Sequence, residues 1–308
     1  MVLPWPTALS RGGNMADADE RAITGLLDEF GDAVAAGLAR MGYRPNASPI
    51  FRPFSLTVIR DKTKVLAGFS PAEGMARMLW MDERDVDYEP AALVDLVQNH
   101  LGQKLNAAVT LCPPESPSRT AQLRLAAAEH VREVETVHAL GKLGDLSGLG
   151  HLEPHLREFL ADHPDYDRNV FIMMRFADTP QMNEIHAAIK GALAERGMHG
   201  IRADDRDYTG ELWSNIEVYL TCCRYGVAVF EDVDQRDHNP NVALELGYMI
   251  GRKKRTLLLK EHRLPTLPSD VVHRLYRPFD MFNIEASVKR EVGRWADVDL
   301  QVGRSTRA

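Results

Sequence analysis

The feature that most constrains the fold is an alternation of apolar and amphipathic segments in the second half of the chain. Four short apolar runs have the length of buried strands: NVFIMM (169–174), GIRA (200–203), GVAVF (226–230) and RTLLLK (255–260). Segments with helical periodicity separate them, at about 180–196, 211–221 and 239–251. Strands that alternate with helices form βαβ units, so this half predicts a parallel sheet with helices on both faces.

The first half has a mixed pattern that predicts a smaller α/β domain. We expect helices over about 18–41, 71–78, 91–105 and 119–140, and strands over 54–59 and 107–112. Four glycines within 141–150 favour a linker at that point. The expected organisation is a disordered leader (1–15), an N-terminal α/β domain (16–140), a linker (141–168), a C-terminal domain (169–300) and a tail (301–308).

Composition excludes some classes of protein. The 37 basic and 44 acidic side chains give a net charge of -7, which disfavours a general nucleic-acid binder and gives no direct nucleic-acid signal. No run reaches the ~18 apolar residues that a membrane helix needs. Two of the three cysteines are adjacent, so a disulfide framework is not expected and a cytoplasmic location is favoured.

The segment HNPNVALELGYMIG (238–251) has the features of a helix that begins at a defined residue. Asn239 is a favoured N-cap, and Pro240 suits the first helical position. An apolar face is expected to pack on the sheet, with Gly247 permitting close approach. The residues predicted for the opposite side are Asn241, Glu245, Tyr248 and Arg252. Periodicity alone favours the interpretation that these polar residues form a solvated helix face.

The position of this helix indicates a second interpretation. It follows the strand 226–230, so its N-terminus is expected at the carboxyl edge of the sheet. Free N–H groups and the positive end of the helix dipole suit a phosphate or a ribose oxygen there. Glu245 lies a little over one turn into the helix, within reach of a sugar at that end.

Four segments together resemble the TIR-like and nucleoside 2-deoxyribosyltransferase-like superfamily. They are VFIMMRF (170–176), IRADD (201–205), GVAVFEDVD (226–234) and NPNVALELGYMIGRKKRTLLL (239–259). Two positions depart from the family pattern: Arg175 stands where proline is common, and Glu231 precedes Asp232 where a small residue is usual. The resemblance covers about 169–282 and implies a flavodoxin-like, TIR-like fold for the C-terminal domain.

The resemblance implies cleavage at the anomeric carbon of a nucleoside or nucleotide. Glu245 matches the family glutamate that acts as nucleophile or stabilises the ribosyl cation, and Asp232 is the best second carboxylate. Asp232 has an equally good interpretation as a loop residue that caps a turn. The nicotinamide of NAD departs neutral, so one carboxylate can suffice, whereas a nucleobase leaving group needs a proton donor.

Other residues are candidates for substrate contacts. Arg175 is expected to pair with a phosphate, and Phe176 either stacks on a base or fills the core. The remaining expected substrate contacts are Asp204, Asp205, Asn239, Asn241 and Tyr248. No histidine or cysteine spacing indicates a metal site, and no cofactor is expected besides NAD as substrate. The basic run RKKR (252–255) is compatible with a contact to nucleic acid, although cations are also favoured at a helix C-terminus.

The favoured hypothesis is a TIR-like NAD hydrolase that acts as a regulated effector in bacterial defence. The resemblance implies assembly into a homo-oligomer on activation, with a small-molecule or protein trigger acting at 16–140. A nucleoside 2-deoxyribosyltransferase or nucleoside hydrolase is one alternative. A non-catalytic nucleotide-binding signalling module is the other.

Overall fold

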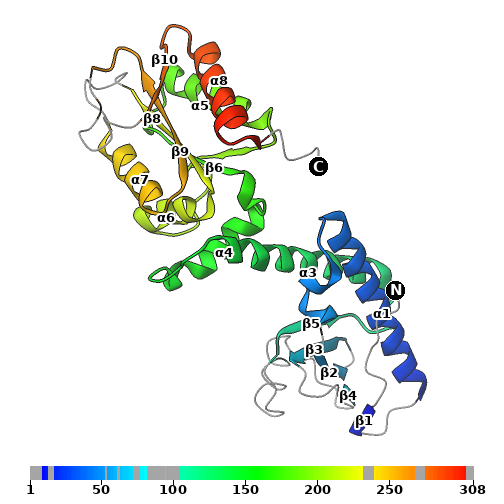
Figure 1. The fold of residues 1–308 in the computed structure, drawn as a ribbon. Coiled ribbons are helices and arrows are strands. Elements are labelled where there is room, and N and C mark those ends of the chain that lie inside the picture. The colour runs from blue at the N-terminus through cyan, green and yellow to red at the C-terminus, as the bar shows by residue number, and fades with distance from the viewer. Residues whose placement is uncertain are drawn as a thin grey trace. The chain divides into compact units, whose positions relative to one another are not determined.

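The chain consists of two compact units, Met1–Glu135 and Thr136–Ala308. The structure is a computed structural model that describes residues 9–12, 17–52, 54–60, 63–71, 77–81, 94, 105–231, 239–265, 267 and 275–302. Each unit has its own sheet and its own hydrophobic core (Figure 1). Within these described ranges, no helix is both long enough and apolar enough to cross a bilayer.

The N-terminal unit is built on a mixed five-stranded sheet. Its strands, in spatial order, are β1 (Leu9–Gly12), β4 (Arg77–Met81), β2 (Phe54–Arg60), β3 (Val65–Pro71) and β5 (Ala107–Leu111). The first three strands are parallel to one another, while β3 pairs antiparallel with both β2 and β5. Two short 3-10 helices, η1 (Pro45–Ala47) and η2 (Pro49–Phe51), precede β2.

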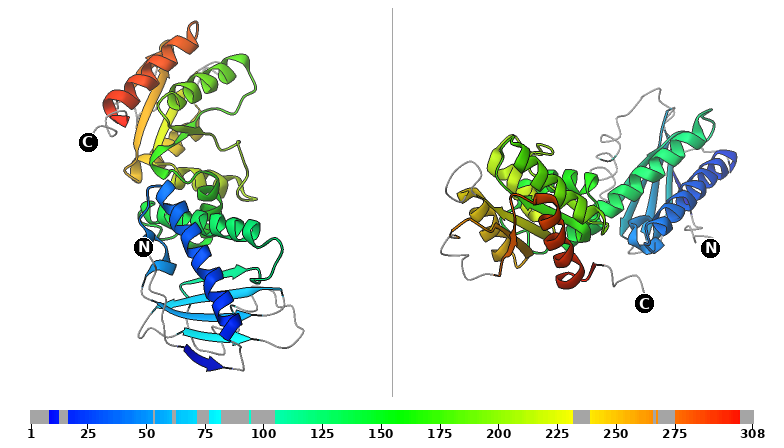
Figure 2. Two further views of the ribbon diagram at one scale, coloured as in Figure 1. Left: turned by 90° about the vertical axis from the view of Figure 1, so that its right-hand side faces the viewer. Right: turned by 90° about the horizontal axis from the view of Figure 1, so that it is seen from above.

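Two long helices, α1 (Asp17–Arg40) and α3 (Arg119–Lys142), cover one face of this sheet (Figure 2). Their apolar residues form one core with alternate residues of the strands, such as Leu56, Val58 and Phe69. The helices touch closely at Gly37, where a Cβ atom would lie 2.7 Å from a methyl carbon of Val131. Only glycine permits this approach of the two helices.

The expectations for this unit are partly confirmed. The helices at 18–41 and 119–140 and the strands at 54–59 and 107–112 are present. The helix expected at 71–78 is wrong at positions 71, 77 and 78, because Pro71 ends β3 and Arg77 begins β4, and 72–76 lies outside the described residues. Residues 9–12, expected in a disordered leader, form β1 through backbone pairing with β4. The helix expected at 91–105 lies outside the described residues except at its positions 94 and 105.

The C-terminal unit is a parallel five-stranded sheet. The spatial order is β7 (His199–Ile201), β6 (Asn169–Met173), β8 (Tyr225–Phe230), β9 (Arg255–Glu261) and β10 (Arg277–Phe279). All four pairings are parallel. In chain order within this unit, the arrangement is 2-1-3-4-5, the order of flavodoxin-like folds. The parallel sheet and fold class expected from the sequence are confirmed.

Helices cover both faces of this sheet (Figure 1). Helices α5 (Pro180–Ala194) and α8 (Ile284–Arg294) share a core with one face, which includes Ile172 and Val227. Helices α6 (Leu212–Cys222) and α7 (Pro240–Gly251) share a core with the other, which includes Phe171 and Ala228. A single π-helical turn, η5 (Trp295–Asp299), follows α8.

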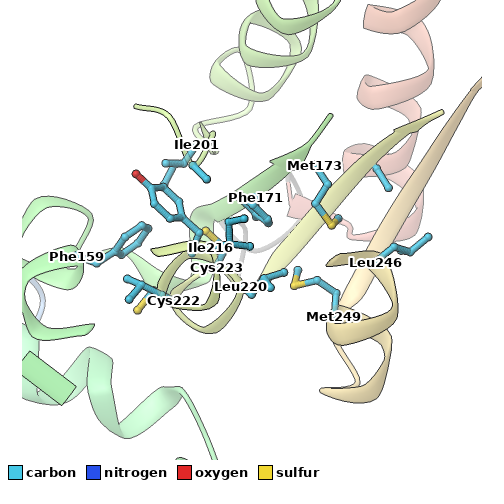
Figure 3. Packing of buried hydrophobic residues seen from close by; sticks show 14 of the residues in the cluster. Phe159, Phe171, Met173, Ile201, Ile216, Leu220, Cys222, Cys223, Leu246 and Met249 are labelled. Atoms are coloured by element: carbon cyan, nitrogen blue, oxygen red, sulfur yellow. The ribbon is translucent and has the colours of Figure 1, made fainter. Parts of the chain in front are cut away.

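The segment 141–168, expected to be a linker, is part of the folded C-terminal unit. It contains α4 (Glu153–Asp162), flanked by the 3-10 helices η3 (Gly150–Leu152) and η4 (Tyr166–Arg168). Leu156, Phe159 and Leu160 recur at helical spacing and are fully buried. The Phe159 ring contacts Tyr219 of α6 at a centroid distance of 5.1 Å, and it lies in the core shown in Figure 3.

Candidate functional site at the carboxyl edge

The carboxyl edge of the parallel sheet is where a ligand site is expected. The chain passes from β6 outward to β7 and then returns to β8 on the other side of β6. The topological switch point therefore lies between β6 and β8. Loops diverge at such a point, and ligands of open α/β sheets bind in the resulting crevice.

Helix α7 begins at this edge, as the sequence predicts. The side-chain Oδ1 of Asn239 accepts a hydrogen bond from the backbone N–H of Asn241 at 3.0 Å, and Pro240 occupies the first helical position. This N-cap satisfies one of the free amides at the helix start. Asn241 itself is exposed.

Glu245 is buried rather than on a solvated face. It is only 6% exposed, and burial raises the pKa of its carboxyl to about 7. Neighbouring turns of the same face carry Val242 and Met249, which are fully buried. Among the residues that the structure describes, the Glu245 carboxyl has no hydrogen bond and no ion pair. The solvated-face interpretation is therefore wrong for this residue.

The buried face of α7 does not include Gly247, which was expected to allow close approach to the sheet. This residue is exposed, and a Cβ added there would meet nothing within 4 Å, so it does not mediate close approach to the sheet. Glu245 stands three residues after Val242 and four before Met249, so it borders the buried face of α7.

Tyr248 belongs to the contact between α6 and α7. Its hydroxyl donates to Oε1 of Glu217 at 3.1 Å, and its ring meets Trp213 edge-on at 6.3 Å. Burial raises the pKa of the Tyr248 phenol. Tyr248 lies three residues after Glu245, so the two side chains share the flank that faces α6.

Arg175 and Glu231 form an ion pair at the switch point. The Nε of Arg175, after β6, donates to Oε1 of Glu231, after β8, at 2.9 Å. Their side chains are 13% and 2% exposed. Glu231 was noted in the sequence only as a departure from a family pattern. An acidic residue directly after a continuous apolar strand was the available signal for a buried partner.

A second group forms where β6 and β7 end. Phe176 is 52% exposed, so it does not fill the core, and the Arg202 guanidinium lies 5.7 Å from its ring centroid. Arg202 also forms a bidentate ion pair with Asp204. At the carboxyl edge, an exposed aromatic ring and an exposed carboxylate thus contact the same arginine, whose side chain is only 15% exposed.

Asp205 is held by local contacts. Its carboxylate accepts a hydrogen bond from the Arg202 backbone N–H at 3.0 Å and forms an ion pair with Lys190 at 3.1 Å. Burial alone raises the pKa of the Asp205 carboxyl, but these contacts outweigh it and leave the pKa below its ordinary value. Asp205 is therefore ionised and stabilises the turn after β7.

Asp232, expected as the second carboxylate, lies outside the described residues. The two groups described above, Arg175 with Glu231 and Phe176 with Arg202, are not joined to Glu245 by a hydrogen bond or ion pair of the described chain. They share the carboxyl edge of the sheet with the start of α7, and each comes from a different strand end.

One group of side chains has the composition of a metal site. Potential ligand atoms of Glu261, His262 and Asp280 lie within 4.8 Å of one another, after β9 and β10. The Glu261 oxygens already accept hydrogen bonds from the Arg263 and Leu264 backbone amides at 2.6 and 3.1 Å and from the Arg263 side chain at 3.2 Å. This cluster is explained as a hydrogen-bonded turn.

Comparisons with known proteins include a weak structural likeness. The chain is similar to a solved structure of a 2-desoxiribosyltransferase from Leishmania mexicana, with 18% identity and a TM-score of 0.26. The match covers 30% of this chain and 64% of that enzyme. No family description matches the chain, and no curated protein matches it. The fold class consequently rests on the strand order, and the site on its own geometry.

Proposed function

We propose that the C-terminal unit cleaves the N-glycosidic bond of a nucleotide, with NAD as the favoured substrate and Glu245 as the group at the anomeric carbon. The observation that carries this proposal is the buried Glu245 carboxyl. It has no partner among the described residues, although it belongs to a helix that begins at the carboxyl edge. A buried carboxyl without a structural partner is a candidate for chemistry.

The chemistry follows from charge. As the C1′–N bond breaks, its electron pair moves onto the nicotinamide nitrogen, and positive charge develops on the ribose. An ionised Glu245 in a low-dielectric site stabilises that charge or bonds to C1′. Water then supplies the oxygen that bonds to C1′ and releases a proton. The products are nicotinamide and ADP-ribose.

The described acidic side chains favour a substrate that needs one carboxylate. Glu217 accepts the hydrogen bond from Tyr248, and Glu231 is paired with Arg175. Glu245 is thus the carboxyl left for a substrate in this part of the site. A cationic nicotinamide ring also favours the ionised form of Glu245, so binding of NAD itself shifts the carboxyl toward its active state.

One observation favours a second candidate, a nucleoside 2-deoxyribosyltransferase or nucleoside hydrolase. With a pKa of about 7, Glu245 is protonated in a large fraction of molecules at neutral pH and is able to donate a proton to a departing base. This reaction needs two carboxyl groups, and Asp232 is the residue expected to supply the second.

The N-terminal unit has its own sheet and core, and glycosidic cleavage by the C-terminal unit does not require it chemically. Our proposal assigns this unit the regulatory role: it receives a trigger and promotes assembly of a homo-oligomer, as expected of a defence effector. A size-exclusion profile that stays monomeric while the protein cleaves NAD at full rate contradicts this part of the proposal.

The experiment is incubation of the full chain with NAD and, separately, with the four deoxynucleosides, followed by chromatography. Release of nicotinamide and ADP-ribose from NAD supports the proposal. Release of free base from deoxynucleosides, with NAD intact, favours the transferase alternative. Saturable NAD binding without any product identifies a non-catalytic binding module and overturns the enzymatic proposal.

A further inference from the structure

We propose that a basic cavity at the amino edge of the C-terminal sheet binds the oligophosphate group of a small molecule. The cavity has a volume of about 280 Å³. Strands β8 and β9 begin there, and helices α6 and α7 end there, so it lies at the edge opposite to Glu245. Its charged lining residues are Arg224, Arg252, Lys253, Lys254 and Arg255.

Two of these cations have structural partners. The Lys254 ammonium donates to the backbone carbonyls of Leu220, Thr221 and Cys223, each at 2.7 Å. These carbonyls lie at the C-terminus of α6, where a cation is favoured. Arg224 forms an ion pair with Asp167. The structural explanation of a basic run at a helix end therefore accounts for these two residues.

The other three cations are not explained in this way. Among the residues described, Arg252, Lys253 and Arg255 have no hydrogen bond from the side chain and no ion pair. Asp167 does not compensate them, because it already binds Lys142 and Arg224. The exposed Asp145 interacts with Arg252 only at longer range. Three positive charges therefore line the cavity, and no described carboxylate forms an ion pair with them.

The backbone at Lys253 strengthens the inference. Its φ is 58°, in the left-handed region that side chains rarely adopt. The amide of Lys254 donates to the Met249 carbonyl at 2.9 Å, which closes α7 in the arrangement that normally places glycine at this position. Glycine at this position would adopt the same backbone conformation with less strain. The chain carries a lysine at a position where a lysine weakens the fold, and this points to use of its charge.

The cavity favours phosphate over an aromatic base as the recognised group. The Arg224 guanidinium covers the Tyr225 ring at 5.5 Å, and the Lys254 ammonium lies 5.7 Å from the Tyr166 ring centroid. The tyrosine rings are therefore occupied by cations. The volume is slightly below the roughly 300–1,000 Å³ of sites that enclose whole drug-sized ligands. A compact oligophosphate fits these properties, whereas a nucleic-acid backbone requires an extended basic track.

Calorimetric titration of the full chain tests the proposal. The probes are inorganic tripolyphosphate, ATP and inorganic phosphate, each at constant ionic strength. We expect one saturable site for tripolyphosphate and for ATP, and binding at least roughly 10-fold weaker for inorganic phosphate, because it contacts fewer cations. Equal affinity of tripolyphosphate and ATP identifies phosphate as the whole determinant, and a higher affinity of ATP adds a nucleoside contribution.

Lys253→Gly tests the role of this charge without an expected loss of stability. It removes the charge and relieves the strain of the positive φ at position 253. The midpoint of its thermal unfolding is therefore expected to equal or exceed that of the wild type. Its dissociation constant for tripolyphosphate is expected to rise roughly 10-fold. Lys253→Arg keeps the charge and is expected to bind within about threefold of the wild type. Arg290→Gln, at an exposed position of α8, removes the same charge elsewhere as a matched control.

Three outcomes overturn the proposal. The first is no saturable binding of tripolyphosphate. The second is wild-type affinity in Lys253→Gly, and the third is an equal loss in Arg290→Gln. The first outcome includes binding of single-stranded nucleic acid without binding of tripolyphosphate. None of these results depends on cleavage of NAD, so this proposal and the proposed function fail independently.

Discussion

The Nε of Arg175 lies 2.9 Å from Oε1 of Glu231, and this contact joins the ends of β6 and β8 at the topological switch point. Both side chains are almost withdrawn from solvent. The arginine, expected to receive a substrate phosphate, is thus already neutralised from within the chain. Its first role is to hold the two strand ends together.

Breaking this pair should destabilise the C-terminal unit. Glu231→Ala removes this ion pair from a buried guanidinium, and we expect a loss of up to about 5 kcal/mol in the free energy of unfolding. Urea denaturation followed by circular dichroism measures it. Arg175→Ala should cost a similar amount, and the double variant should cost less than the sum. Additive losses would contradict direct pairing.

Glu245 should make stability depend on pH in a defined direction. The folded state holds the proton of this carboxyl up to a pH of about 7, whereas the unfolded state releases it near 4.5. Its contribution is therefore fully present below pH 4.5 and is lost as the pH rises through 7. The loss amounts to at most about 3 kcal/mol.

Glu245→Gln isolates this contribution. The variant should be more stable than the wild type at pH 8 by up to about 3 kcal/mol, and the difference should shrink toward pH 5. Urea titrations at both pH values measure it. Glu184→Gln, at an exposed position of α5, should show no such trend. A variant less stable than the wild type at pH 8 would show that the carboxylate has a stabilising partner.

The same protonation should govern turnover. If the ionised carboxylate faces the developing ribosyl cation, kcat/KM for NAD rises with pH and levels off above about 7. Initial rates of nicotinamide release between pH 5.5 and 8.5 give the profile. A decrease through the same range would indicate that the protonated form acts, as a deoxyribosyl transfer to a base requires. A flat profile contradicts both roles of Glu245.

Lys254 should be structural rather than catalytic. Burial lowers the pKa of its ammonium to about 8, so it is still mostly protonated at pH 7 and donates to three carbonyls at the end of α6. Lys254→Met removes these donors and should destabilise the protein by about 2–4 kcal/mol. Thermal denaturation measures the change, with Lys253→Gly as the neighbouring control. Unchanged stability of Lys254→Met would refute this role.

The sequence predicted the parallel sheet well because its strands are short, continuous and apolar. Residues 169–174 and 226–230 have no other reasonable interpretation between two amphipathic helices. The secondary structure of the N-terminal unit was harder to predict. The stretch 71–78 contains the end of one strand and the start of another, and the periodicity of so short a segment does not distinguish strand from helix.

The sequence predicted the helix that carries the candidate site better than it predicted the burial and contacts of the side chains there. The N-cap at Asn239 was readable because capping is a local interaction. The burial of Glu245 was not predicted, although its spacing from Val242 and Met249 places it beside the buried face of α7. The pairing of Arg175 with Glu231 spans 56 residues of sequence, and only the strand order brings the two together.

The rate of nicotinamide release from NAD, compared between the wild type, Glu245→Gln and Glu184→Gln, tests the central claim most directly. The substitution of glutamine for Glu245 keeps the shape of the side chain but removes its negative charge. The account predicts a loss of at least about 10²- to 10³-fold for Glu245→Gln, with the fold intact by circular dichroism, and a wild-type rate for Glu184→Gln. Release of nicotinamide by folded Glu245→Gln at the wild-type rate would contradict it.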